Sequence, residues 1–424
     1  MKRASSLTLI AVLTATLSVA AHIEEITYLP NDHPAIQYVQ QPPDDPVARL
    51  GKRIESGDVK LDYSPEFGYL PALLKQFGLN IDSQVLVFSK TSFQATKIGP
   101  RAPRALYFND DVMMGSVQTG DVLEFAALDP QQGFNFYTLD IAKADKPEFV
   151  RRDTCLQCHQ GLSTLGVPGI LVSSVYPGPD GMPAFRGNAM ITDHRTALDQ
   201  RWGGWYVTGT HGSQSHMGNA VAHNSSQPQL LDIKGTQNLT SLEKKFDPSK
   251  YLAPTSDIVA LMTLEHQTRM TNLMMRIGWD TRIALHDGKV DDSVRDRLNG
   301  EIEDMVTYML FADERLITEP IQGVSTFTKT FAERGPRDHQ GRSLRDFDLE
   351  KRLFRHPLSY MIYSAAFDSM PQLVRERVYQ RLYDILTGKD QSQTYARLTS
   401  EDRRSILEIL RDTKPNLPTY WAAQ

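Results

Sequence analysis

The period of the hydrophobic pattern changes about halfway along the chain, and this change limits the folds that are open to it. Four short runs rich in β-branched and aromatic residues are separated by Gly, Pro and Asp, which is typical of an antiparallel sheet. They cover 84–90, 104–110, 122–129 and 134–140, and two similar runs follow at 169–176 and 204–210. After residue 256 apolar residues recur at spacings of three and four, which predicts helices instead.

The predicted helices lie at 256–276, 292–312, 348–367, 371–387 and 400–412, with a shorter one at 69–77 before Gly78. Residues 22–60 are polar and contain two adjacent prolines, so we expect an extended lead-in there. Together these elements predict an α+β fold. Its expected parts are a β-rich N-terminal region at 22–150, a segment at 151–250 that contains both cysteines, and a helical domain at 251–424.

Residues 1–21 have the pattern of a signal peptide. Lys2 and Arg3 precede an uncharged stretch at 7–20 that is too short to span a bilayer comfortably. Small residues end this stretch and predict cleavage near Ala21 or His22. An uncleaved anchor is the alternative, which the short length disfavours. We therefore expect a bacterial protein that is periplasmic or secreted, with no integral membrane segment after signal cleavage.

Composition narrows the classes of partner. With 40% hydrophobic and 23% charged residues the chain resembles an ordinary globular protein. Its formal net charge is −5 and becomes more negative once the basic leader is removed, so nucleic acid is not an expected partner.

The only two cysteines, Cys155 and Cys158, stand two residues apart and are followed at once by His159 in the run CLQCH. A structural zinc site needs about four ligands, and no second cysteine pair is present. A redox dithiol should begin a helix directly after a core strand, whereas the preceding run PEFVRRD is charged and turn-like. A disulfide across two residues would be strained and would close a very small loop.

Attachment of a c-type haem uses every member of this motif. The two thiols add to the haem vinyl groups, and the next residue places its imidazole on the iron. We therefore predict one covalent haem c on Cys155 and Cys158, with His159 as the proximal iron ligand, and 151–250 as the haem-binding segment. Such haems are assembled outside the bacterial cytoplasm, in agreement with the predicted signal peptide.

On these residues the sequence resembles a c-type cytochrome. The runs RWGGWYVTGTHG and LEHQTRM and the C-terminal region are also similar to large monohaem cytochrome-c-domain proteins of unassigned function. This resemblance implies a family and no activity. Small class I cytochromes fold in about 100 residues and have a Met ligand near the end of that domain, so the present chain departs from them in length and in ligand position.

The second iron ligand is the least determined part of the prediction. His266 lies in LMTLEHQTRMTNLMM, where Met262 and Met270 share its helical face, and we predict it as the distal ligand. The alternative is a core histidine on an ordinary apolar stripe. His216 and Met217, in the loop GTHGSQSHMGN, are alternative ligands.

Charged neighbours complete the predicted site. Three arginines, Arg151, Arg152 and Arg201, could pair with the haem propionates, because a guanidinium matches a carboxylate bidentately; their alternative is solvated surface charge. His194 is expected to hydrogen-bond its neighbour Asp193 in a turn.

Two functions follow from the sequence. The first is electron transfer with a redox partner protein, which suits a chain without a second cofactor motif. The second is a haem enzyme, peroxidase- or oxidase-like, with an open or displaceable distal site for a small-molecule substrate. A thiol oxidoreductase is a minor third hypothesis.

Overall fold

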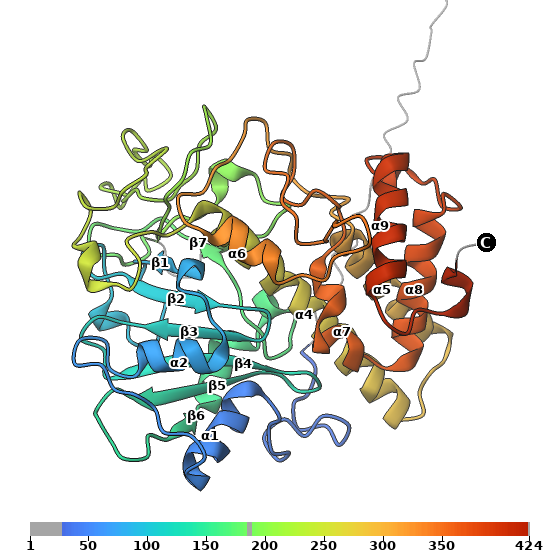
Figure 1. Cartoon of the computed structure of the whole chain (residues 1–424), viewed down its shortest axis with the longest axis horizontal. Coiled ribbons are helices and arrows are strands. Elements are labelled where there is room, and N and C mark those ends of the chain that lie inside the picture. The colour runs from blue at the N-terminus through green and yellow to red at the C-terminus, as the bar shows by residue number, and fades with distance from the viewer. Residues whose placement is uncertain (1–27, 185–188, 423–424) are drawn as a thin grey trace, which may run out of the picture.

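The computed structural model describes residues 28–184 and 189–422, and an antiparallel sheet forms one side of it (Figure 1). The strand order is β6-β5-β4-β3-β2-β1-β9. The strands are β1 (Val85–Val87), β2 (Arg104–Phe108), β3 (Val112–Ser116), β4 (Val122–Asp129), β5 (Gly133–Asp140), β6 (Phe149–Arg151) and β9 (Trp205–Tyr206). A separate pair joins β7 (Ser173–Ser174) to β8 (Met190–Ile191).

The two faces of the sheet are both buried, which the alternation along each strand explains. On one face Phe125 and Tyr137 pack with α1 (Pro46–Ser56) and α2 (Leu70–Phe77). On the other face Phe136 and its neighbours pack against the helical part of the chain. Figure 1 shows α2 lying across the sheet.

The helical part is built around α4 (Ile258–His286), which runs from the sheet to a group of helices on the opposite side (Figure 1). These are α5 (Asp292–Met309), α8 (Gln372–Leu386) and α9 (Ser400–Thr413), with α6 (Phe327–Glu333) and α7 (Ala365–Ser369) nearer the sheet. The α+β class is therefore confirmed. One of the two core clusters among the described residues contains Leu29, Phe136, Trp202, Trp279 and Trp421, so all three predicted regions contribute to it.

The extended lead-in predicted at 22–60 is wrong in its second half, where α1 forms. Asp45 caps this helix by accepting from Ala48 N, and Pro46 stands in its first turn. Val47, Leu50 and Ile54 then bury one side of it. The capping and spacing signals were present in the sequence but were outweighed by the polar composition.

The helix predicted at 348–367 is also wrong. This stretch is mostly turns, with a short 3-10 helix at Tyr360–Tyr363 before α7. Pro357 lies in its middle, and a proline cannot donate a helical hydrogen bond and clashes with the preceding turn. Strand β3 and helix α6 were not predicted from the sequence, whereas α4, α5, α8 and α9 lie close to their predicted positions.

The predicted signal peptide lies outside the described residues. Among the residues that the structure describes, none of the helices is both long enough and apolar enough to pass through a membrane.

Asp257 holds the start of α4 and offers a test of this architecture. It is fully buried, and its carboxylate accepts from Val259 N at 2.8 Å, Val324 N at 2.9 Å and Ser325 N at 2.8 Å. Asp257→Ala leaves these donors without an acceptor, so we expect the free energy of unfolding in urea to fall by about 2–4 kcal/mol.

The matched control is Asp291→Ala, which removes the exposed cap of α5 and should cost about 1 kcal/mol. A loss for Asp257→Ala no larger than for this control would contradict the role given to Asp257.

Candidate haem-attachment site

The cysteine motif lies at the edge of the sheet, directly after strand β6. The turn-like character predicted for the run PEFVRRD is therefore wrong, although β6 is a short edge strand and not a core strand. Arg151 pairs with Tyr137 of β5, and Arg152 N donates to Phe136 O at 2.8 Å. The chain then coils through a 3-10 turn (Asp153–Cys155) into α3 (Leu156–His159). Cys155, Cys158 and His159 therefore lie on one compact helical stretch, which is the arrangement that haem attachment requires.

Both cysteines have free thiols, with Cys155 half-buried and Cys158 exposed. Burial, and then the nearby Glu124 carboxylate, raises the pKa of the Cys155 thiol. A redox-active dithiol needs the opposite shift, because the thiolate is the nucleophile. The thiol environment thus disfavours the oxidoreductase hypothesis and leaves both sulfurs available for covalent attachment.

His159 makes two hydrogen bonds with Gly169, and the one from its ring orients the imidazole. His159 Nδ1 lies 2.9 Å from Gly169 O, and Gly169 N donates to His159 O at 2.8 Å. A carbonyl can only accept, so Nδ1 carries the proton and the lone pair is on Nε2. Burial lowers the pKa of His159, which favours this neutral form. A metal-ligating histidine commonly has this arrangement, with one nitrogen donating to a carbonyl and the other on the metal.

The loop at 160–170 that carries Gly169 is fixed by the sheet and by α4. Phe134 N donates to Pro168 O at 3.1 Å, and Asn272 Nδ2 donates to Ile170 O at 2.8 Å. A Cβ on Gly169 would lie 2.2 Å from Asn272 Oδ1, so the close approach of α4 requires glycine here. The orientation of His159 therefore depends on a helix more than 100 positions away in the sequence.

An ion pair beside the motif was missed by the sequence analysis. Arg104 Nη1 donates to Glu124 Oε2 at 2.8 Å, and both side chains are half-buried. The charge of Arg104 contributes to lowering the pKa of His159 and that of Glu124 opposes it, both after burial. Each strand carries a charged residue, Arg104 in β2 and Glu124 in β4, at a position that alternation places on the same face as core residues. These two charges were the signal in the sequence.

The three arginines predicted to meet propionates have different surroundings. Arg151 donates to Tyr38 O at 2.7 Å and lies over the Tyr38 ring. Arg152 is exposed and donates through Nε to Thr138 Oγ1. Arg201 is buried in an ion pair with Glu265 at 3.1 Å, and donates to backbone carbonyls, so its guanidinium already has acceptors.

His266, predicted as the distal ligand, lies fully buried in α4 with a protein partner for each ring nitrogen. Its Nε2 lies 2.7 Å from Ser359 Oγ, and its Nδ1 lies 2.9 Å from His194 Nδ1. Its ring also stacks against Tyr308 and Phe311. This environment favours the core-histidine alternative over iron ligation.

His194 therefore does not make the predicted turn bond with Asp193. The Asp193 carboxylate instead accepts from Arg195, at 2.7 Å for Nη2, and His194 turns inward, with Nε2 facing Asp313 at 3.5 Å. One of the two facing Nδ1 atoms carries the proton of this contact, and the other accepts it. Burial lowers the pKa of both histidines, so both are held neutral.

The alternative ligands, His216 and Met217, are buried in a different part of the loop region. The His216 ring lies 5.5 Å from the Trp202 ring and 4.8 Å from the His211 ring. Met217 Sδ accepts from Ser174 Oγ at 3.5 Å. In the part of the chain that the structure describes, no hydrogen bond or ring contact joins either residue to Cys155, Cys158 or His159.

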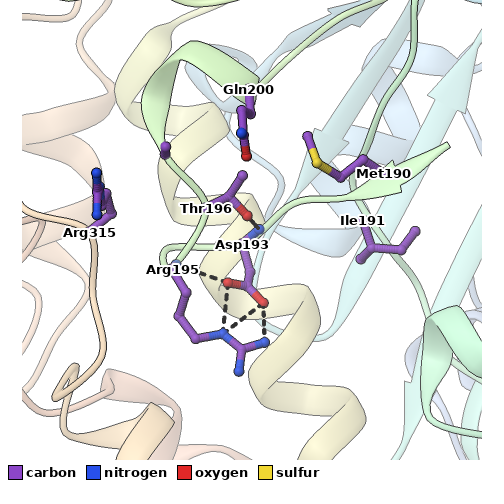
Figure 2. A pocket seen from close by; sticks show the side chains of 8 residues that line it. Met190, Ile191, Asp193, Arg195, Thr196, Gln200 and Arg315 are labelled. Carbon is purple, nitrogen blue, oxygen red and sulfur yellow. Dashed lines mark hydrogen bonds and ion pairs between the residues drawn. The ribbon is translucent and has the colours of Figure 1, made fainter. Parts of the chain in front are cut away.

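A surface cleft of about 550 Å³ opens beside the His194 turn (Figure 2). Figure 2 shows Asp193 and Arg195 bonded to each other within it, with Arg315 on a neighbouring segment. Its lining residues are Met190, Ile191, Asp193, Arg195, Thr196, Ala197, Gln200 and Arg315. None of them belongs to the cysteine motif.

A group of three side chains suited to metal binding joins the N-terminal segment to the end of α4: His33, His286 and Asp287. Ala35 N donates to His33 Nδ1 at 3.2 Å, so the neutral imidazole carries its proton on Nε2, which donates to Asp287 Oδ1 at 3.1 Å. The nitrogen that faces the carboxylate is thus a donor, and the group is satisfied as a hydrogen-bonded network.

Comparison with known proteins gives no relative for this fold or site. No protein-family model, curated protein or solved structure matches the chain.

The buried His194–His266 pair predicts a pH dependence of stability. A histidine in the unfolded chain has a pKa of about 6.5. Because burial lowers the folded value, the unfolded state binds more protons below pH 6.5, and the free energy of unfolding falls as the pH falls. One such histidine contributes up to about 1.4 kcal/mol per pH unit. We expect His266→Gln to reduce this slope in urea unfolding series between pH 7.5 and 5.

The control is His223→Gln at an exposed position, which should leave the slope unchanged. An equal slope in wild type and His266→Gln would show that His266 does not contribute to the pH dependence.

Proposed function

We propose that this chain is an exported monohaem c-type cytochrome that acts in electron transfer. The observation that carries the proposal is the hydrogen bond from His159 Nδ1 to Gly169 O, which leaves the lone pair on Nε2, on the same helical stretch as two free thiols. Cys155 and Cys158 would hold the haem covalently, and His159 would ligate the iron. When bound, the haem supplies a one-electron ferric/ferrous couple.

The surroundings of the motif support electron transfer over the enzyme alternative. Cys158 is exposed, so a group attached there would have an edge near the surface, where a partner protein can approach. The Gly169 carbonyl, by accepting from Nδ1, would make the imidazole a better donor to a haem iron. The cleft in Figure 2 is lined by residues outside the motif, so it does not provide an evident substrate route to His159.

The partner is proposed to be a redox protein in the periplasm or outside the cell. The predicted signal peptide supports this location, because c-type haem is attached after export.

The first test of the proposal is covalent attachment. Coexpression with haem-maturation machinery should give a protein whose intact mass exceeds the polypeptide by one haem, and acid-acetone should leave the colour with the protein. The double variant Cys155→Ala/Cys158→Ala should lose both properties. A wild-type mass equal to that of the polypeptide alone, or complete extraction of the haem, would contradict the proposal.

A second test concerns the orientation of His159. Gly169→Ala should displace the carbonyl that accepts from Nδ1, because the new methyl group would meet Asn272 Oδ1. We expect a shifted Soret band and reduced haem occupancy, a milder version of the effect of His159→Ala.

The matched control is Gly161→Ala in the same loop, where the nearest atom to an added Cβ is 3.6 Å away and φ is −134°. Unchanged spectra and full loading in His159→Ala would remove His159 from the proposed coordination.

A further inference from the structure

The Arg104–Glu124 pair lies on the sheet face beneath the cysteine motif. Arg104 alternates with Leu106 along β2, and Glu124 alternates with Ala126 along β4, so the pair shares a face with these core residues. Ala126 is directly opposite Phe136, whose ring lies 4.7 Å from the His159 ring. Both charges also act on the pKa of His159. The pair therefore lies on the sheet face against which the His159 ring packs.

Arg104 has one edge in use and one edge without an acceptor. Its Nη1 donates to Glu124, but its Nε is buried and has no hydrogen-bond partner among the described residues. A buried N–H without an acceptor is unfavourable, which points to a missing group at this position.

The second carboxylate oxygen of Glu124 has donors other than Arg104. Its Oε1 already accepts from Ser92 Oγ at 3.1 Å and from Gln94 Nε2 at 3.0 Å. The carboxylate is thus fully engaged, and it anchors one edge of the guanidinium while the other edge stays available. A guanidinium in this state matches a second carboxylate, because its fork of N–H groups can serve two acceptors.

We infer that Arg104 binds a propionate of the haem through Nε, with Glu124 as the residue that positions it. This inference rests on the proposed function. It assigns to a strand residue 51 positions before Cys155 the role that the sequence analysis sought in Arg151, Arg152 and Arg201.

The test compares holoprotein of wild type, Arg104→Gln and the control Arg101→Gln, which changes an exposed arginine just before β2. Loss of a positive charge near the iron favours the ferric form. We expect the ferric/ferrous equilibrium of Arg104→Gln to shift about tenfold, which is about 59 mV lower for one electron. Resonance Raman spectra should show a shifted propionate bending band in Arg104→Gln and not in Arg101→Gln.

The outcomes separate this inference from the proposed function. A covalent haem in Arg104→Gln with unchanged potential and unchanged propionate band overturns the inference and leaves the cytochrome proposal standing. A lower potential with an unchanged propionate band would show that Arg104 acts on the iron only as a distant charge. That result also overturns the inference. Absence of covalent haem from wild type overturns both.

If Arg104→Gln does not yield holoprotein, Glu124→Gln carries the test. This variant removes a negative charge and loosens the hold on Arg104, so both a raised potential and a shifted propionate band are expected. An unchanged band there overturns the inference.

Discussion

Helix α4 is buried on nearly every side over most of its length, and the rest of the structure is arranged to satisfy the polar groups that this burial encloses. Asp257 at its start caps the helix and holds the segment at 324–325. Glu265 pairs with Arg201, and His266 bonds His194 and Ser359. Each bond fixes a segment distant in sequence, because a buried polar group without a partner is costly.

The geometry of the candidate site also depends on contacts with α4. Asn272 of α4 bonds the carbonyl next to Gly169, and Gly169 in turn directs the ring of His159. Because the loop is also bonded to the sheet at Phe134, the imidazole is oriented by the two largest elements of the fold. A side chain held in this way is oriented by secondary structure before it binds any group.

The sequence predicts those parts of the structure whose causes are local. Strands β4 and β5 were found because period-two alternation appears within a few residues, and α4 was found because its apolar spacing is continuous. The helix expected at 348–367 failed at Pro357, where a local breaker was outweighed by apolar spacing. The Cys-x-x-Cys-His motif was also found locally, because its predicted chemistry sets the spacing.

The remaining site residues could not be found in this way, because their roles arise from contacts across the fold. The sequence around Gly169 does not indicate that Asn272 will contact it. Arg104 comes close to Glu124 only because β2 and β4 are both paired to β3 in the sheet. His266 shows the converse case. A Met-lined helical face with one histidine suits a cofactor or a core equally well in sequence, and only the partners at both ring nitrogens distinguish the two.

The exposure of the motif bears on why covalent attachment would be suited to this place. A haem held by contacts alone needs a cavity that covers most of its surface, because apolar burial supplies the affinity. Two thioether bonds would remove that requirement, so the group could be held at a sheet edge where Cys158 is exposed and Cys155 only half-buried. An iron ligand oriented in advance by Gly169 would then add coordination to an already attached group, and the exposed edge would be left to a redox partner.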